Sequence, residues 1–184
     1  MTEIGGTDMR VILSAPEIDR VLSRLAHEIV EKNQCLGNLV IIGIRRRGIT
    51  LARRIARKIR EIQGTVVPVE ELDISRYRDD CPASTRIDHG EPSLLSFSVQ
   101  GKRVVLVDDV LCTGRTIRAA MDGLITLGRP QAVQLAVLLV RGHREFPIRP
   151  DYVGKNVPTP RREVIDVRLL EDDGRDEVII WNSE

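Results

Sequence analysis

The sequence predicts an α/β fold in which a doubly wound, mainly parallel sheet is flanked by helices and followed by a terminal β-hairpin. Two features carry this prediction. Three short apolar segments have the composition of strands buried on both faces of a sheet, namely 39–44, 103–107 and 132–140. Amphipathic helical patterns alternate with them along the chain, at 18–30, 51–62 and 116–127.

The first helix is expected to begin at Ser14-Ala15-Pro16-Glu17, where Ser14 and Glu17 form a capping box and Pro16 occupies the first turn. Its apolar face repeats at helical spacing from residue 18 to residue 30. The apolar strand over 39–44 follows it. The next helix is expected to close at Gly64, because glycine readily adopts the left-handed conformation that ends helices.

The middle of the chain is less regular. Two strand pieces are expected at 65–69 and 71–75, where Pro68 favours a sheet edge or a bulge. Residues 76–95 are polar and contain two prolines, which predicts a flexible loop of the length that active-site lids have. An extended arm is then expected to turn at Gln100-Gly101, before the strand that begins at residue 103.

The C-terminal part of the chain predicts a helix over 116–127 that ends at Gly128. Residues 163–170 and 177–181 alternate between apolar and polar side chains on either side of Asp172-Asp173-Gly174-Arg175. This pattern is typical of two strands joined by a turn, and it predicts a terminal hairpin.

Length and charge limit the possible functions. With 184 residues the chain fits one domain, so we expect a single domain over 1–184 with a flexible N-terminus over 1–13. A formal net charge of +1 argues against a general polyanion-binding protein. The charge is unevenly distributed, since residues 45–60 hold eight basic residues and no acid, whereas residues 161–184 hold four arginines and eight acids. Such polarity indicates one basic face.

The cysteines and the N-terminus indicate the compartment. Cys35, Cys81 and Cys112 are odd in number and form no CxxC pair, which argues for a reducing environment and against a disulfide framework or a zinc site. The first ten residues lack the apolar segment of a signal peptide, and no segment approaches the roughly 18 apolar residues of a membrane span. We therefore expect a cytoplasmic protein with no membrane segment.

The segment after the strand at 103–107 has the pattern of a phosphate-binding loop. Asp108 and Asp109 stand where the strand ends, and Thr113-Gly114-Arg115-Thr116 opens the next helix. Ligands of open α/β sheets bind at the carboxyl ends of the strands. Gly114 permits close backbone approach, while free N–H groups, the helix dipole and two threonine hydroxyls favour a phosphate. Two carboxylates beside such a cradle suit the vicinal hydroxyls of a sugar.

This run, from Val104 to Thr116, resembles the fingerprint of the type I phosphoribosyltransferases. Further segments resemble one family among them, the PyrR-type pyrimidine-operon regulators that are also uracil phosphoribosyltransferases. The resemblance spans roughly residues 14–184. The segments that carry it are 43–48 (GIRRRG), 71–80 (ELDISRYRDD), 141–149 (RGHREFPIR) and 153–159 (VGKNVPT).

The resemblance implies a role for each part of the site. The 5-phosphate would be held by Thr113, Gly114, Arg115 and Thr116. The diphosphate would be held by Arg45, Arg46, Arg47 and Gly48, and Arg47 would act in catalysis together with Asp108 and Asp109. The two aspartates would bind the ribose hydroxyls, partly through Mg²⁺, which they would hold indirectly through substrate and water. The base would be bound by Arg141, Lys155 and Asn156.

The implied activity is transfer of the phosphoribosyl group of 5-phosphoribosyl diphosphate to uracil, which yields UMP and diphosphate. The implied regulatory role is UMP- or UTP-responsive binding to the leader RNA of pyrimidine genes. The residues implied in RNA binding are Ser23, Arg24, His27, Arg46, His143 and Arg149. Relatives form dimers that pair further, so a homodimer or a dimer of dimers is expected.

Two departures from the family pattern leave alternatives open. Relatives usually carry tyrosine at the position of Cys112 and aspartate at that of Val140. A missing carboxylate at position 140 would weaken base or metal binding, and the chain would then be an RNA-binding nucleotide sensor with little or no transferase activity. A purine phosphoribosyltransferase is a third interpretation. Purine enzymes usually carry an aspartate at the position of Cys112, and the absence of that aspartate disfavours the purine interpretation.

Overall fold

The computed structural model describes residues 9–78 and 95–182. Its centre is a wholly parallel sheet of five strands in the order β3-β2-β4-β5-β6. These strands are β2 (Leu39–Ile44), β3 (Val69–Leu72), β4 (Arg103–Leu111), β5 (Ala132–Val140) and β6 (Tyr152–Asn156). The α/β fold class with a mainly parallel sheet is therefore confirmed.

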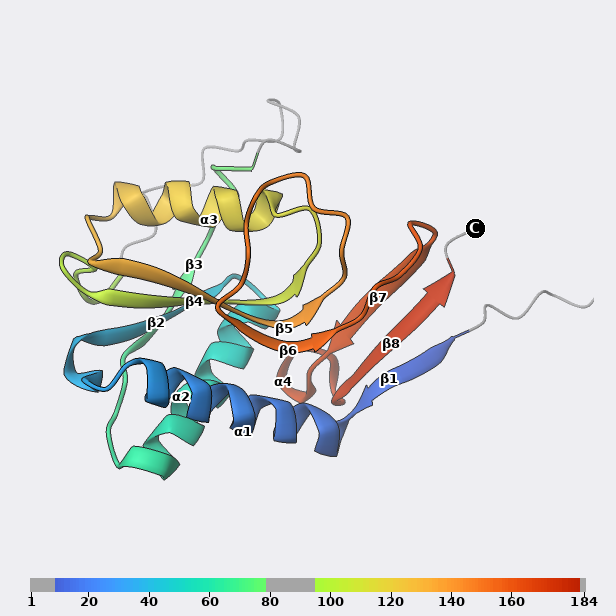
Figure 1. The fold of residues 1–184 in the computed structure, drawn as a ribbon, viewed down its shortest axis with the longest axis horizontal. Helices are drawn as coiled ribbons and strands as arrows, with labels where there is room; N and C mark the ends of the chain where they lie inside the picture. The colour runs from blue at the N-terminus through green and yellow to red at the C-terminus, as the bar shows by residue number, and fades with distance from the viewer. Residues whose placement is uncertain (1–8, 79–94, 183–184) are drawn as a thin grey trace, which may run out of the picture.

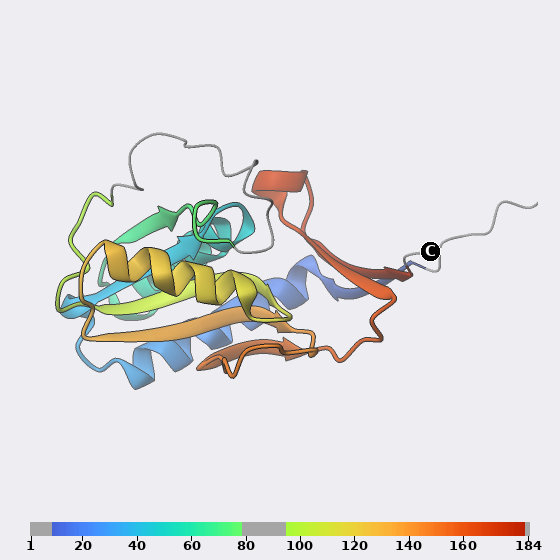
Figure 2. The same ribbon diagram turned by 90° about the horizontal axis from the view of Figure 1, so that it is seen from above.

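Helices cover both faces of this sheet. Helices α1 (Ala15–Lys32) and α2 (Arg47–Gln63) lie on one face, and α3 (Arg115–Thr126) lies on the other (Figures 1 and 2). Two separate hydrophobic clusters correspond to these layers, one containing Ile18, Leu51 and Val105 and one containing Val104, Leu106 and Ile117. Because successive side chains of a strand point to opposite faces, neighbouring residues of β4 enter different clusters.

A second sheet is antiparallel and has the order β1-β8-β7. It is formed by β1 (Arg10–Ser14), β7 (Glu163–Arg168) and β8 (Glu177–Asn182). The terminal hairpin is thus confirmed, with the short helix α4 (Leu170–Asp173) inserted in its connection. The expectation of a flexible N-terminus is wrong for residues 10–13, because they pair with the edge of β8. Residues 1–8 lie outside the described residues.

Several element boundaries differ from the expectation. Only β3 forms between residues 65 and 75, and it starts directly after Pro68, which has no N–H to donate to a ladder. Helix α2 begins at Arg47 rather than at residue 51, so part of the predicted diphosphate loop is helical. Strand β4 continues through Asp108 and Asp109. Strand β6 was not expected as a strand, and it pairs in parallel with β5.

The capping box is confirmed. The backbone N–H of Ser14 donates to the carboxylate of Glu17 at 2.8 Å, and the Ser14 hydroxyl donates to the same oxygen at 2.7 Å. Among the described residues, no helix is long and apolar enough to cross a membrane. Most of the predicted lid, residues 79–94, lies outside the described residues, so the lid stays a prediction.

Candidate active site

A cleft of about 370 Å³ opens at the carboxyl ends of β2, β3 and β4. Its walls come from the segments after β2 and β3, the last residues of β4 and the first turn of α3; they include Arg45, Arg46, Arg47, Asp73, Ser75, Arg78, Asp108, Asp109 and Thr116. A larger recess of about 590 Å³ lies against α3 and the start of β5, but its walls are mostly apolar. The charged groups that chemistry would need converge only in the first of these two cavities.

The phosphate-binding loop is built around Gly114. This residue caps α3 with φ +90° and ψ −1°, a backbone conformation that glycine adopts without steric cost. An added Cβ would lie 3.3 Å from Cβ of Phe146, so the loop is also tightly covered. The N–H groups of Glu145 and Phe146 both donate to the carbonyl oxygen of Thr113, at 2.9 and 3.2 Å.

Arg115 is held on the outer side of this loop. Its Nε donates to Glu145 at 2.7 Å, and its guanidinium lies over the ring of Phe146, 5.4 Å from the centroid. Glu145 and Phe146, which follow β5, therefore hold the phosphate-binding loop in place. Arg115 is thus oriented by contacts with Glu145 and Phe146.

The acid pair, Asp108 and Asp109, lines the cleft. Asp108 is only 7% exposed. Burial raises its pKa well above the ordinary value, and the neighbouring charge of Asp109 raises it further. Burial also raises the pKa of Asp109, although the backbone N–H of Val110 and the charge of Arg47 oppose the shift. A buried and a half-buried carboxylate on consecutive residues favour a bound cation or hydroxyl donors, because either compensates their mutual repulsion.

The predicted diphosphate loop also lines the cleft. Arg46 has φ +78° and lines the cleft, and it forms no ion pair with another described residue. Arg45 pairs with Asp73 and with Glu71, the latter at 3.6 Å. Gly48 is required by packing, since a Cβ there would lie 2.6 Å from the carbonyl oxygen of Val107. The loop can therefore lie directly against the end of β4, beside the acid pair.

Arg47 is oriented by the C-terminal hairpin. Its Nε and one Nη donate to the two carboxylate oxygens of Asp173, at 3.3 and 3.1 Å, and the same Nη lies 3.6 Å from Asp166. Sequence reasoning missed both acids. The only signal was the excess of acids in residues 161–184, which gives no partner for any one of them.

The predicted base-binding residues do not converge in the structure. Arg141 donates to the Thr159 hydroxyl at 2.9 Å and to carbonyl oxygens of residues 160, 161 and 163, so it holds the segment that leads into β7. Lys155 donates to the carbonyl oxygen of Ile12 at 3.1 Å and lines a separate recess with Arg20 and Arg24. Its side chain points to the α1 side of the sheet, away from the cleft, so this position does not support a role for Lys155 in binding the base.

Asn156 is the predicted base-binding residue whose position fits best. It ends β6 and is paired in register with Val140, the last residue of β5. Val140 is buried, and its carbonyl oxygen accepts the N–H of Val157 at 2.8 Å. Asn156 therefore lies beside Val140, the position at which relatives carry an aspartate.

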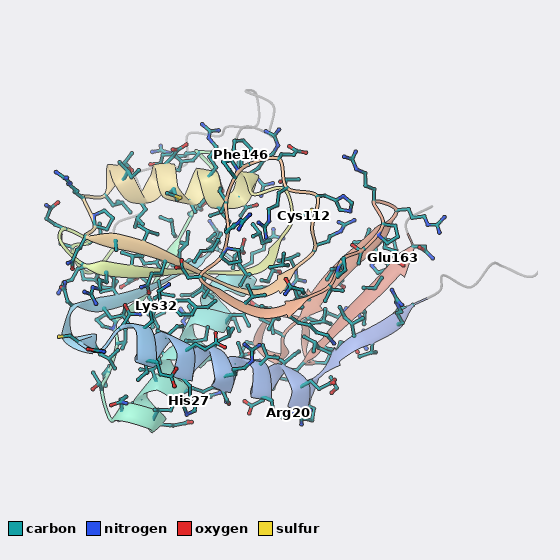
Figure 3. All side chains as sticks on the ribbon, viewed as in Figure 1. Arg20, His27, Lys32, Cys112, Phe146 and Glu163 are labelled. Atoms are coloured by element: carbon teal, nitrogen blue, oxygen red, sulfur yellow. The ribbon has the colours of Figure 1, made fainter. Side chains whose placement is uncertain are left out.

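The six predicted RNA-binding residues occupy two faces of the molecule. His27 lies on α1, on the side of the sheet opposite Phe146 and Cys112 (Figure 3). Its Nδ1 donates to the carbonyl oxygen of Ser23 at 2.8 Å, and the Ser23 hydroxyl donates to that of Asp19 at 2.9 Å. His143, with φ +59°, instead follows β5 and donates to the carbonyl oxygen of Thr159 at 2.7 Å. Arg149 is exposed in the same connection.

Comparison with known proteins identifies the family. A model of the phosphoribosyl transferase domain matches residues 10–172. A bifunctional protein PyrR of Pelotomaculum thermopropionicum is 56% identical over 172 residues, which are 94% of this chain and 95% of that protein. The PyrR of Deinococcus radiodurans is 54% identical over 173 residues, which are 94% of each chain.

Solved structures agree at the level of the fold. A hypoxanthine phosphoribosyltransferase of Trypanosoma cruzi superposes with a TM-score of 0.72 at 20% identity, covering 95% of this chain and 97% of that one. At such low identity this likeness supports the architecture alone. Together with the phosphate-binding loop and the acid pair at the end of β4, the comparisons show that this chain is a phosphoribosyltransferase-fold protein that belongs to the PyrR family.

Proposed function

We propose that this protein transfers the phosphoribosyl group of 5-phosphoribosyl diphosphate to uracil and also binds pyrimidine-leader RNA in response to UMP or UTP. The observation that carries the first half is the cleft itself. An arginine loop, the acid pair at the end of β4 and Thr116 line one space of about 370 Å³. Thr116 lies in the first turn of α3, which Gly114 caps in a left-handed conformation. These groups can bind a 5-phosphate, a ribose and a diphosphate.

In this proposal the 5-phosphate accepts hydrogen bonds from the backbone N–H groups of residues 113–116. Asp108 and Asp109 accept hydrogen bonds from the ribose hydroxyls, which compensates the burial of their charges. The diphosphate then lies toward Arg46 and Arg47, whose guanidinium groups match phosphate oxygens. The ends of the substrate are thereby fixed on opposite walls, with C1 of the sugar between them.

The residues fit Mg²⁺ as a cofactor. Among the described residues no group of three His, Cys, Asp or Glu side chains could hold a metal ion. Mg²⁺ is commonly bound by one or two carboxylates together with substrate phosphates and water, and Asp108 with Asp109 provides those two carboxylates. When bound with the substrate, the ion would neutralise charge on the diphosphate.

The chemical step requires no protein nucleophile. N1 of uracil bonds to C1 as the bond between C1 and the diphosphate oxygen breaks, and the N1 proton is lost to the diphosphate or to water. The transition state has oxocarbenium character, so the protein's tasks are orientation, stabilisation of the leaving group and exclusion of bulk water. Arg46 and Arg47 stabilise the charge that develops on the departing diphosphate. We assign the exclusion of water to the segment 76–95, acting as a lid.

A substrate comparison tests the transferase assignment. Saturating turnover should be measured with uracil, hypoxanthine and guanine under the same conditions. We expect transfer to uracil and little to the purines, because Cys112 offers no carboxylate to protonate a purine ring. Equal rates with uracil and hypoxanthine would contradict the pyrimidine assignment.

The regulatory half rests on the basic residues of α1 and of the connection after β5. Arg24 is exposed and lines one recess with Lys155, Arg20 and Glu17. Its guanidinium pairs with Glu28 at 2.6 Å, so contact with an RNA phosphate would use its remaining N–H groups. The two predicted groups of RNA-binding residues lie on different faces of one chain, so an assembly of two or four copies is part of the proposal. A cytoplasmic location is part of the same proposal, because phosphoribosyl diphosphate and leader RNA are made there.

A nucleotide in the cleft would have to bind the RNA-competent form more tightly, and RNA would then raise nucleotide affinity by the same factor. Leader RNA should therefore be titrated with and without UMP, at several salt concentrations. We expect tighter binding with UMP and a steep fall with salt, since each neutralised phosphate contributes roughly 0.7–0.9 to the log–log slope.

A second candidate function follows from Val140. This residue is buried in the core cluster under α3, where relatives carry a carboxylate. If the protein bound UMP and leader RNA but showed no turnover with uracil, it would be a nucleotide sensor only. Val140→Asp would then be the variant to examine for restored transfer.

A further inference from the structure

The start of α2 is strongly positive and receives its counter-charge from far away in the sequence. The first turn of this helix contains no acid, and its N-cap, Arg46, makes no side-chain capping hydrogen bond. Positive side chains at a helix N-terminus add to the positive end of the helix dipole. The opposing charges come from the turn between β7 and β8, which lies about 120 residues later in the chain.

Three contacts along one face of α2 attach this acidic turn. Residues 47, 50 and 54 follow each other at helical spacing and each contacts a different part of the turn. Thr50 donates to Asp172 at 2.7 Å, and Arg54 pairs with Asp176 at 2.7 Å and with Glu171. Arg47 makes the third contact, to Asp173.

The Arg47–Asp173 contact differs from the other two because Arg47 also lines the cleft. Asp173 engages Nε and one Nη, which form the lateral edge of the guanidinium. A guanidinium has five N–H donors in a rigid fork, so its other edge can still bind a phosphate while the lateral edge is occupied.

Asp173 is itself held in place. Its carboxylate accepts the backbone N–H of Leu169 at 3.0 Å. Burial acts to raise the pKa of Asp173, but the hydrogen bonds from Arg47 and Leu169 outweigh it and keep the pKa below the ordinary value. The carboxylate is therefore a fixed, ionised group at neutral pH.

We infer that Asp173 is a positioning residue, which orients Arg47 so that its free edge faces the diphosphate of the substrate. This inference rests on the proposed function, because it requires that diphosphate binds beside Arg47. A long side chain that is ordered before the ligand arrives loses less freedom on binding. Asp173 also adds a negative charge near the diphosphate, which by itself would weaken anion binding, so a test has to separate the two effects.

Glu171 supplies the matched control. It lies on the same turn and carries the same charge, but it pairs with Arg54, which keeps Asp176 as a second partner. Glu171→Gln and Asp173→Asn each remove one negative charge from the turn. Only Asp173→Asn breaks the two-point contact with Arg47, because an amide has a single acceptor oxygen. Affinities for phosphoribosyl diphosphate, diphosphate and UMP should be measured by calorimetry for the parent and both variants, with their Tm values.

Relative to Glu171→Gln, we expect Asp173→Asn to weaken binding of the two diphosphate-bearing ligands by roughly three- to tenfold, the cost of ordering one long side chain. UMP has no diphosphate, so its affinity should be equal in the two variants. Asp173→Glu should recover part of the loss. A structural defect would lower UMP affinity as well and would overturn the inference, as would equal or tighter diphosphate binding in Asp173→Asn. If the parent bound no diphosphate-bearing ligand, the proposed function itself would fail.

Discussion

Replacing Gly114 by alanine tests the conformation on which the phosphate-binding loop depends. Gly114 has φ +90°, and an L-residue in a left-handed conformation costs about 1–2 kcal/mol. The new Cβ would also lie 3.3 Å from Cβ of Phe146, a close contact that adds at least about 1 kcal/mol when a packed region has to shift. We expect a total loss of about 2–3 kcal/mol in the free energy of unfolding.

For a chain of this size 1 kcal/mol corresponds to roughly 2–4 °C, so Tm should fall by roughly 4–12 °C. Relaxation of the strained cap would turn backbone N–H groups away from the phosphate. Losing one charge-assisted hydrogen bond should weaken UMP binding at least about tenfold. Thermal denaturation followed by circular dichroism and UMP titration by calorimetry measure the two effects separately.

Gly101→Ala is the matched control. Gly101 also has a positive φ, +67°, but an added Cβ there meets nothing within 4 Å, and the residue lies in the turn before β4. This variant should lose about 1 kcal/mol from backbone strain and keep the parental UMP affinity. If Gly114→Ala lost no more stability than Gly101→Ala and bound UMP like the parent, the left-handed cap would not be what organises the phosphate-binding loop.

Three further predictions follow from the charges. Asp108→Asn should raise the Tm of the ligand-free protein at pH 7, because burial raises the pKa of this carboxyl and its ionisation therefore opposes folding. The same variant should lower turnover with uracil at least about tenfold. An unchanged Tm would contradict the stability prediction. Arg54→Met should lower stability by about 2–3 kcal/mol in urea denaturation, because it leaves Asp176 and Glu171 without their shared cation. The hydrogen bond from Arg54 lowers the pKa of Glu171, so the stabilisation from this pair is present at neutral pH and is lost as the pH falls below about 4; Arg54→Met should therefore show a smaller loss of Tm between pH 6 and pH 3 than the parent. Arg149→Ala should weaken leader-RNA binding and leave uracil transfer nearly unchanged, since Arg149 is exposed outside the cleft; parental RNA affinity would exclude this residue from the RNA surface.

The sequence by itself determined the features that depend on local pattern. The three buried strands, the capping box at Ser14 and the glycine ends of the helices are encoded within a few neighbouring residues, and each lies at or near its predicted place. The phosphate-binding loop belongs to the same group, because a strand, an acid pair and a glycine-capped helix start follow one another directly in the chain. Backbone geometry then leaves the loop only one edge of the sheet to occupy.

The tertiary structure decided which distant residues contact each of these features. The sequence alone predicts a flexible terminus at residues 10–13. They form a strand because the edge of β8 is unpaired there, and the local sequence of residues 10–13 contains no information about that edge. Lys155 belongs to a segment that resembles a base-binding hood, yet the alternation of side chains along β6 points it toward β1 and α1. Asp173 contacts Arg47 across 126 residues of chain. Contacts of this kind depend on how helices and sheets pack, and charge composition only indicates that an acidic segment and a basic segment attract each other.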